Sequence, residues 1–193
     1  MARFDEDNRA RAEAIVALYP KPRSALIPLC HLSQGQNGYL TREAMEEIGE
    51  LCGVSAAEVY GTATFYDMLH TERVGRYVIA ACTNIACLLA DAYDFLEHAE
   101  RRLGIRVGQT TEDGEFTLEE AECLAGCDMA PCVQVNHRFV GQLDADGFDK
   151  LLLDLRAGRL SSDIPQHGVL CRVARSVNLP GNTASDESGA VSV

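Results

Sequence analysis

Four of the eight cysteines in this 193-residue chain fall into two closely spaced pairs, and these pairs are the residues best suited to chemistry. Cys82 and Cys87 form a C-x4-C pair, and Cys123 and Cys127 form a C-x3-C pair. Four thiolates are the usual ligand set of a [2Fe–2S] cluster, in which each close pair can hold one iron while inorganic sulfides bridge the two irons. The spacing therefore predicts bound iron and sulfide and one-electron chemistry.

The same residues leave two alternatives open. A structural zinc site also takes four thiolates, from pairs separated by two to four residues. Cys127 and Cys132 form a second C-x4-C pair, so spacing alone allows Cys132 to replace Cys123 as a ligand. Pro131 precedes the expected strand that begins at Cys132, which favours a core position for this thiol. A dithiol redox site and a Rieske site are disfavoured, because the chain has no C-x-x-C and no histidine beside either pair.

The remaining cysteines and the N-terminus indicate a reducing compartment. Cys30 and Cys52 fall on predicted helix faces and are interpreted as small apolar residues, while Cys171 has no assigned role. The N-terminal residues lack the apolar core of a signal peptide and are too acidic for a transit peptide. Cytosolic thiols are normally reduced, so a disulfide framework is not expected. Metal or redox chemistry is the better explanation of the cysteine content.

The composition excludes several classes of partner. The formal net charge of −12 argues against nucleic acid and against an anionic membrane surface, both of which need clustered basic residues. No segment approaches the about 20 apolar residues that span a bilayer. We therefore expect a cytoplasmic protein with no direct membrane insertion.

Residues 1–72 carry short helical patterns separated by turn residues, which predicts an N-terminal helical bundle. Acidic residues 5–7 suit the start of the first helix. Ser24, Thr41 and Ser55 are expected to cap the next three helices. Ser55 and Glu58 have the spacing of a capping box.

The pattern changes near Gly75 to that of an α/β domain, which we expect at residues 73–158. A strand-like apolar run at 76–82 leads into the first cysteine loop, and residues 88–103 have the spacing of an amphipathic helix. The expected later elements are a short strand at 116–118, a hairpin of 132–135 and 139–143, and a helix capped by Asp146 and ended by Gly158. This β-α-β-β-α order predicts an α+β chain whose second domain is thioredoxin-like. Residues 159–193 are expected to form a partly flexible C-terminal extension, with an apolar segment at 169–177.

Four stretches resemble one protein family. They are ALYPKPRSALIPLCHLSQGQNGYL at 17–40, EVYGTATFY at 58–66, ACTNIAC at 81–87 and ECLAGC at 122–127, the last followed by Ala130-Pro131. Together they resemble the small iron–sulfur subunit of NADH:quinone oxidoreductase (respiratory complex I). Related subunits occur in NAD-reducing hydrogenases and NAD-dependent formate dehydrogenases. The resemblance runs from roughly Ala17 to Gly158 and is loose beyond Leu160.

The resemblance implies a specific role. It implies a thioredoxin-like [2Fe–2S] ferredoxin domain whose ligands are Cys82, Cys87, Cys123 and Cys127, which sets Cys132 aside. It also implies an electron-transfer subunit that binds a larger flavoprotein subunit and the rest of the peripheral arm, at the inner face of the cell membrane. That partner is expected to carry FMN, the NADH site and a [4Fe–4S] cluster. Consistent with this, the present chain has no Gly-rich dinucleotide fingerprint.

Overall fold

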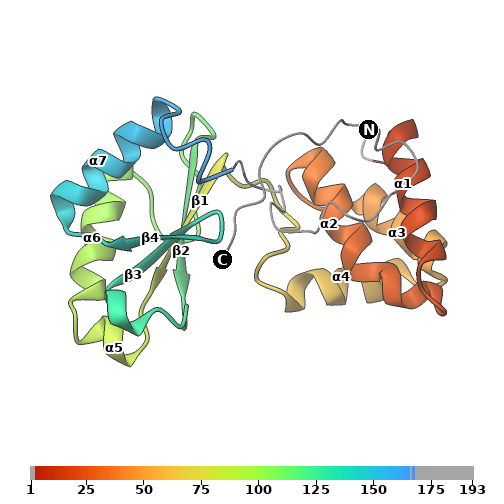
Figure 1. Ribbon diagram of the computed structural model, residues 1–193, viewed down its shortest axis with the longest axis horizontal. Coiled ribbons are helices and arrows are strands. Elements are labelled where there is room, and N and C mark those ends of the chain that lie inside the picture. Colours follow the sequence, from red (N-terminus) through yellow and green to blue (C-terminus); the bar gives the residue numbers. More distant parts are fainter. Residues whose placement is uncertain (1–2, 166, 168–193) are drawn as a thin grey trace, which may run out of the picture. The chain divides into compact units, whose positions relative to one another are not determined.

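The computed structural model describes residues 3–165 and 167, and these divide into two compact units at the junction of Thr71 and Glu72 (Figure 1). Within this described part, no helix is long and apolar enough to cross a membrane. The expectations for Cys171, the apolar segment at 169–177 and the tail lie outside the described residues.

The N-terminal unit is entirely helical. Its elements are α1 (Glu6–Ala17), the 3-10 helix η1 (Pro22–Ala25), α2 (Leu26–Asn37), α3 (Arg42–Cys52) and α4 (Ala56–Phe65). Thr41 Oγ1 accepts the N–H of Ala44 at 3.2 Å, and Ser55 forms a reciprocal capping box with Glu58, so both predicted caps are confirmed. The predicted cap at Ser24 is wrong. This residue lies inside η1, where its backbone is already helical, and α2 begins at Leu26 without a side-chain cap.

A single apolar core holds the bundle together. Cys30 and Cys52 are 0 % and 3 % exposed within it, as expected of small apolar residues. Helix α4 buries only Val59 and Ala63, and Phe65 at its end is 79 % exposed. The aromatic side chains of the EVYGTATFY stretch therefore lie largely on the surface of this unit.

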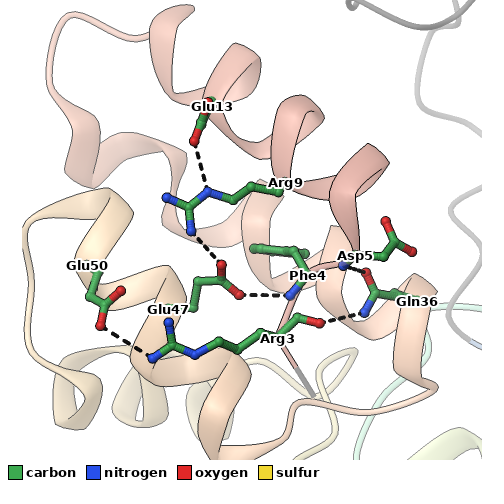
Figure 2. Close-up of polar contacts among 8 residues, drawn as sticks. All are labelled: Arg3, Phe4, Asp5, Arg9, Glu13, Gln36, Glu47 and Glu50. Carbon is green, nitrogen blue, oxygen red and sulfur yellow. Dashed lines mark hydrogen bonds and ion pairs between the residues drawn. The ribbon is translucent and has the colours of Figure 1, made fainter. Parts of the chain in front are cut away.

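A buried carboxylate fixes the first residues to the bundle (Figure 2). Glu47 of α3 is 3 % exposed and accepts the backbone N–H of Phe4 at 2.8 Å and Nη1 of Arg9 at 2.6 Å. The Gln36 amide binds the backbone on both sides of Phe4. Its Nε2 donates to the Arg3 carbonyl at 2.9 Å, and its Oε1 accepts the N–H of Asp5 at 3.0 Å. A buried carboxylate needs such partners, because an unpaired charge in an apolar core is costly.

The second unit is a two-layer α/β fold. Its elements are β1 (Tyr77–Cys82), α5 (Ile85–Leu88), α6 (Ala92–Leu103), β2 (Phe116–Ala121), η2 (Cys127–Met129), β3 (Cys132–Val135), β4 (Arg138–Gln142) and α7 (Ala145–Arg156). The sheet order is β2-β1-β3-β4, with β1 parallel to β2 and antiparallel to β3. Helices α6 and α7 lie side by side on one face of this mixed sheet (Figure 1). The expected α+β class is confirmed.

The core of the second unit lies between this sheet face and the two helices. Alternate residues of β1 (Tyr77, Ile79 and Ala81) point into it, together with Phe116 of β2 and Phe148 of α7. Because successive side chains of a strand point to opposite faces, Cys82, one residue beyond Ala81, lies on the opposite side of the strand from this core. The alternation therefore directs the first cysteine away from the helical layer.

Two predicted helices differ from the structure in their bounds, and the strand expected at 116–118 continues to Ala121. The helix expected at 88–103 is divided into α5 and α6 by a turn in which Asp91 has φ 62°. The final helix is capped by Asp144, which accepts the N–H of Gly147 at 2.8 Å, rather than by Asp146. In both cases the local pattern is compatible with either arrangement, and packing selects one.

Candidate metal centre

The parallel pairing of β1 and β2 brings the two cysteine loops to one edge of the sheet. Cys82, the last residue of β1, lies opposite Ala121, the last residue of β2. The N–H of Thr83 donates to the Ala121 carbonyl at 3.0 Å, so the pairing continues beyond the strands. Because parallel strands end at the same edge, the loops at 83–87 and 122–127 leave the sheet side by side.

The first loop turns directly into a short helix. Asn84 caps α5, with its Oδ1 accepting the N–H of Ile85 at 2.9 Å. This turn carries Cys87 under the surface, where it is 1 % exposed, while Cys82 is 4 % exposed. Both belong to a small buried cluster that also contains Cys132. The first pair of thiols therefore lies in the interior.

The second loop has a tight and partly strained path. Ala125 has φ 57°, in the left-handed region that is unfavourable for a residue with a Cβ. A Cβ at Gly126 would lie 2.7 Å from the Sγ of Cys132, so only glycine fits there. Cys123 and Cys127 are exposed on either side of this turn. The second pair of thiols therefore lies at the surface.

Backbone N–H groups from both loops stabilise the Cys82 thiolate. Burial by itself would raise the pKa of Cys82. The N–H groups of Leu124 and Asn84 and the Cys87 thiol outweigh it and lower the pKa below its ordinary value. For Cys87, burial dominates and raises the pKa, although the N–H of Cys132 donates to its Sγ at 3.4 Å. Since Leu124 belongs to the second loop, its contact with Cys82 joins the two loops.

Cys132 has the environment of a core residue. It opens β3 and is 1 % exposed. Burial, with the neighbouring thiols of Cys87 and Cys82, raises the pKa of Cys132 to about 11. Its thiol lies in the interior beside the first pair of cysteines, in the same buried cluster.

The donor set suits a [2Fe–2S] cluster. Two pairs of thiols lie on adjacent loops, and backbone N–H groups approach the sulfurs, which is the usual protein environment of such clusters. In the part of the chain that the structure describes, no three His, Cys, Asp or Glu side chains are grouped so as to hold one metal ion. A [2Fe–2S] cluster does not need such a group, because each iron takes two thiolates and bridging sulfides complete its coordination.

Three groups that shape the site were not predicted from the sequence. Asn84 is a residue type favoured at the N-cap, but the helix was predicted to begin only at Leu88, so Asn84 was not considered as a cap. Gly126 directly precedes a cysteine in a short loop, a pattern that indicates close backbone approach. The N–H of Cys132 carries no sequence signal, because its direction depends on the position of β3.

Comparison with known proteins agrees with these observations. The family model of the thioredoxin-like [2Fe–2S] ferredoxin matches residues 12–156. An NADH-quinone oxidoreductase subunit of Rhizobium meliloti (strain 1021), designated E 2, is 44% identical over 149 residues, which cover 77% of this chain and 89% of the relative. The mitochondrial NADH dehydrogenase (ubiquinone) flavoprotein 2 of Dictyostelium discoideum is 35% identical over 166 residues, covering 84% of this chain and 67% of the relative.

A solved structure extends the comparison to the fold. The NAD+-reducing [NiFe]-hydrogenase in its H2-reduced state superposes on 73% of this chain with a TM-score of 0.63 and 24% sequence identity. This chain spans 24% of that hydrogenase chain, and the likeness concerns the fold alone. The match to the family model and the identity to the curated relatives cover most of the chain. The chain therefore belongs to the thioredoxin-like [2Fe–2S] ferredoxin family.

Proposed function

We propose that this chain is the [2Fe–2S] electron-transfer subunit of an NADH-oxidising complex of the NADH-quinone oxidoreductase type, with Cys82, Cys87, Cys123 and Cys127 as the cluster ligands. The observation that carries the proposal is the junction of the two cysteine loops, where parallel strands end together and the Cys82 Sγ donates to the Glu122 carbonyl of the second loop at 3.7 Å. When bound, a [2Fe–2S] cluster supplies a one-electron carrier. The relatives named as NADH-quinone oxidoreductase subunits support this assignment.

The protein's own contribution is to hold the thiolates and to set their electrostatic environment. N–H groups directed at sulfur raise the reduction potential of such a cluster, and nearby carboxylates lower it. Glu122 and Asp128 are exposed beside the two surface cysteines. On an acidic chain we expect a low midpoint potential, comparable to the about −400 mV of plant-type clusters, in a potentiometric titration.

Hydride chemistry belongs to a partner in this proposal. The chain has no Gly-rich dinucleotide fingerprint, so a larger flavoprotein subunit would supply FMN, the NADH site and a [4Fe–4S] cluster. The complex, including the rest of a peripheral arm, would hold this chain at the inner face of the cell membrane. An equivalent subunit of an NAD-reducing hydrogenase is the second candidate, supported by the shared fold. Isolation of the complex with its quinone reductase or hydrogenase activity separates the two candidates.

The deciding experiment is metal analysis of the chain purified without oxygen. We expect two irons and two acid-labile sulfides per chain, with visible absorption that bleaches on reduction by dithionite. Serine replacement of each proposed ligand should lower iron content, while Cys132→Ser should retain it. Stoichiometric zinc in a colourless protein that resists iron–sulfur reconstitution would refute the proposal and make this a structural zinc module.

A further inference from the structure

One carboxylate joins the first cysteine loop to the sheet and to helix α6. Oε1 of Glu120, near the end of β2, accepts the hydroxyl of Thr83 at 2.7 Å and the hydroxyl of Tyr93 at 3.3 Å. Thr83 directly follows Cys82 and opens the first cysteine loop, while Tyr93 lies in the first turn of α6. The shorter distance, to Thr83, is typical of a charge-assisted hydrogen bond, which is roughly twice as strong as a neutral one.

This hydrogen bond lies on the side of the sheet opposite Cys82. Ala81 of β1 and Leu118 of β2 belong to the core on the helical side of the sheet. Thr83 and Glu120 follow them by two residues, so both lie on that same side, because side chains alternate along a strand. Glu120 is therefore linked to Cys82 through Thr83 rather than by direct contact.

The hydrogen bond gives the start of the first cysteine loop a second attachment to β2. The N–H of Thr83 already donates to the Ala121 carbonyl at 3.0 Å. The hydroxyl bonds the preceding residue of the same strand, so the backbone and the side chain of Thr83 are both held by β2. The next residue, Asn84, caps α5, the helix that carries Cys87. The attachment at Thr83 therefore determines where α5 begins, and with it the position of Cys87.

We propose that Glu120 is a positioning residue for the [2Fe–2S] cluster, which holds the first cysteine loop, through the Thr83 hydroxyl, in the arrangement that binds iron. This inference rests on the proposed function, because it takes Cys82 and Cys87 as cluster ligands. The carboxylate also disfavours an added electron, because nearby negative charge lowers the reduction potential of a cluster. Position and charge have separable effects: Thr83→Val removes the hydrogen bond alone, and Glu120→Gln removes the charge but keeps an acceptor oxygen.

The positioning role is tested on the cluster-loaded full chain with Thr83→Val, which has nearly the same shape as the wild-type residue. Loss of the visible absorption in the iron chelator bipyridyl should be several-fold faster than in wild type. At a fixed potential, the ratio of reduced to oxidised cluster should fall several-fold, because a loosened loop directs the Asn84 N–H less well at the Cys82 sulfur. The matched control is Tyr93→Phe, which removes the other hydroxyl from the same oxygen without changing the loop, and both quantities should stay close to wild type.

The charge is tested by Glu120→Gln. The ratio of reduced to oxidised cluster should rise several-fold, opposite in sign to the effect of Thr83→Val, while the cluster should survive bipyridyl nearly as long as in wild type. Glu112→Gln is the control, since Glu112 is an exposed carboxylate that precedes β2, at the other end of the strand from the cysteine loops. This control should leave the ratio unchanged. A purely structural role of Glu120 would leave the ratio unchanged in Glu120→Gln as well, and that result would overturn the charge effect.

Hydrogen exchange of the cluster-free chain tests the positioning without the cluster. Thr83→Val should speed exchange in peptides covering residues 83–89 several-fold and leave the peptides of α7 unchanged. Wild-type exchange in 83–89, or a wild-type cluster lifetime in Thr83→Val, would overturn the positioning role alone. A wild-type chain that takes up no iron and sulfide would instead overturn the proposed function, and the exchange rates would still decide whether Glu120 holds the loop.

Discussion

Replacing Arg9 should destabilise the N-terminal unit more than neutralising its partner Glu47, although both changes break the same ion pair (Figure 2). The asymmetry follows from burial. The Glu47 side chain is 4% exposed, whereas the Arg9 side chain is 41% exposed and also binds Glu13 at 2.9 Å. Arg9 can therefore be rehydrated after Glu47 is changed, but Glu47 cannot be rehydrated after Arg9 is changed.

The magnitudes follow from what each variant leaves behind. Arg9→Met leaves a buried carboxylate with only the Phe4 N–H, and because stranding a buried charge costs about 3–5 kcal/mol, we expect about 3 kcal/mol. Glu47→Gln leaves no buried charge, and the loss of one charge-assisted hydrogen bond costs about 1.5 kcal/mol. The double variant should be more stable than Arg9→Met alone, because it removes the stranded charge.

Native-state hydrogen exchange of peptides from α1 and α3 reports the opening free energy of this unit separately from the rest of the chain. Arg42→Met is the matched control, since the Arg42–Glu46 pair is exposed and should contribute less than about 0.5 kcal/mol. An effect of Glu47→Gln equal to or larger than that of Arg9→Met would refute the reasoning. So would a double variant whose destabilisation is the sum of the two single changes, since stranded charge predicts strong non-additivity.

Three further predictions concern other buried groups. Burial raises the pKa of Cys30 from 9.0 to about 12. The unfolded chain therefore loses this proton at a lower pH than the folded chain, so the free energy of unfolding should decline as pH rises from about 9 to 12. In urea denaturation across this range, Cys30→Ala should flatten the decline. Gly126→Ala should lower iron content after reconstitution several-fold, because its Cβ would meet Cys132 Sγ, and Cys132→Ala in the same chain should restore part of it. The Asn136 side chain accepts the N–H of Val78 at 2.8 Å and donates to the carbonyls of Arg76 and Pro165 at 3.0 and 2.7 Å. Its φ of 48° is also unfavourable for alanine, so Asn136→Ala should lower the free energy of unfolding by about 3 kcal/mol, measured by thermal unfolding.

Helix starts were predictable where the signal is local. Thr41 and Ser55 each bond an N–H three residues ahead, so residue type and spacing are sufficient to identify them. The cap at α7 was not predictable in the same way, because Asp144 and Asp146 both suit an N-cap. Which of them is used depends on where β4 ends and on how α7 packs against the sheet.

The division between α5 and α6 shows where periodicity misleads. Leu88 and Leu89 match the apolar stripe of a helix, yet both are exposed, because the chain turns at Asp91. Periodicity reports which residues can share a face, and it carries no information on whether another element covers that face. Here the core side of the sheet is already occupied by α6 and α7.

The sequence by itself determined the chemical type of the candidate site, the pairing of cysteines within each loop and the family, because these depend on residue identity and short spacing along the chain. The tertiary structure decided that the two loops meet, since the parallel register of β1 and β2 joins segments far apart in sequence. It also decided that Cys82 and Cys87 are buried while Cys123 and Cys127 are exposed. Burial, and with it the pKa of Cys82 and of Cys87, depends on atoms contributed by other elements, which no local pattern contains.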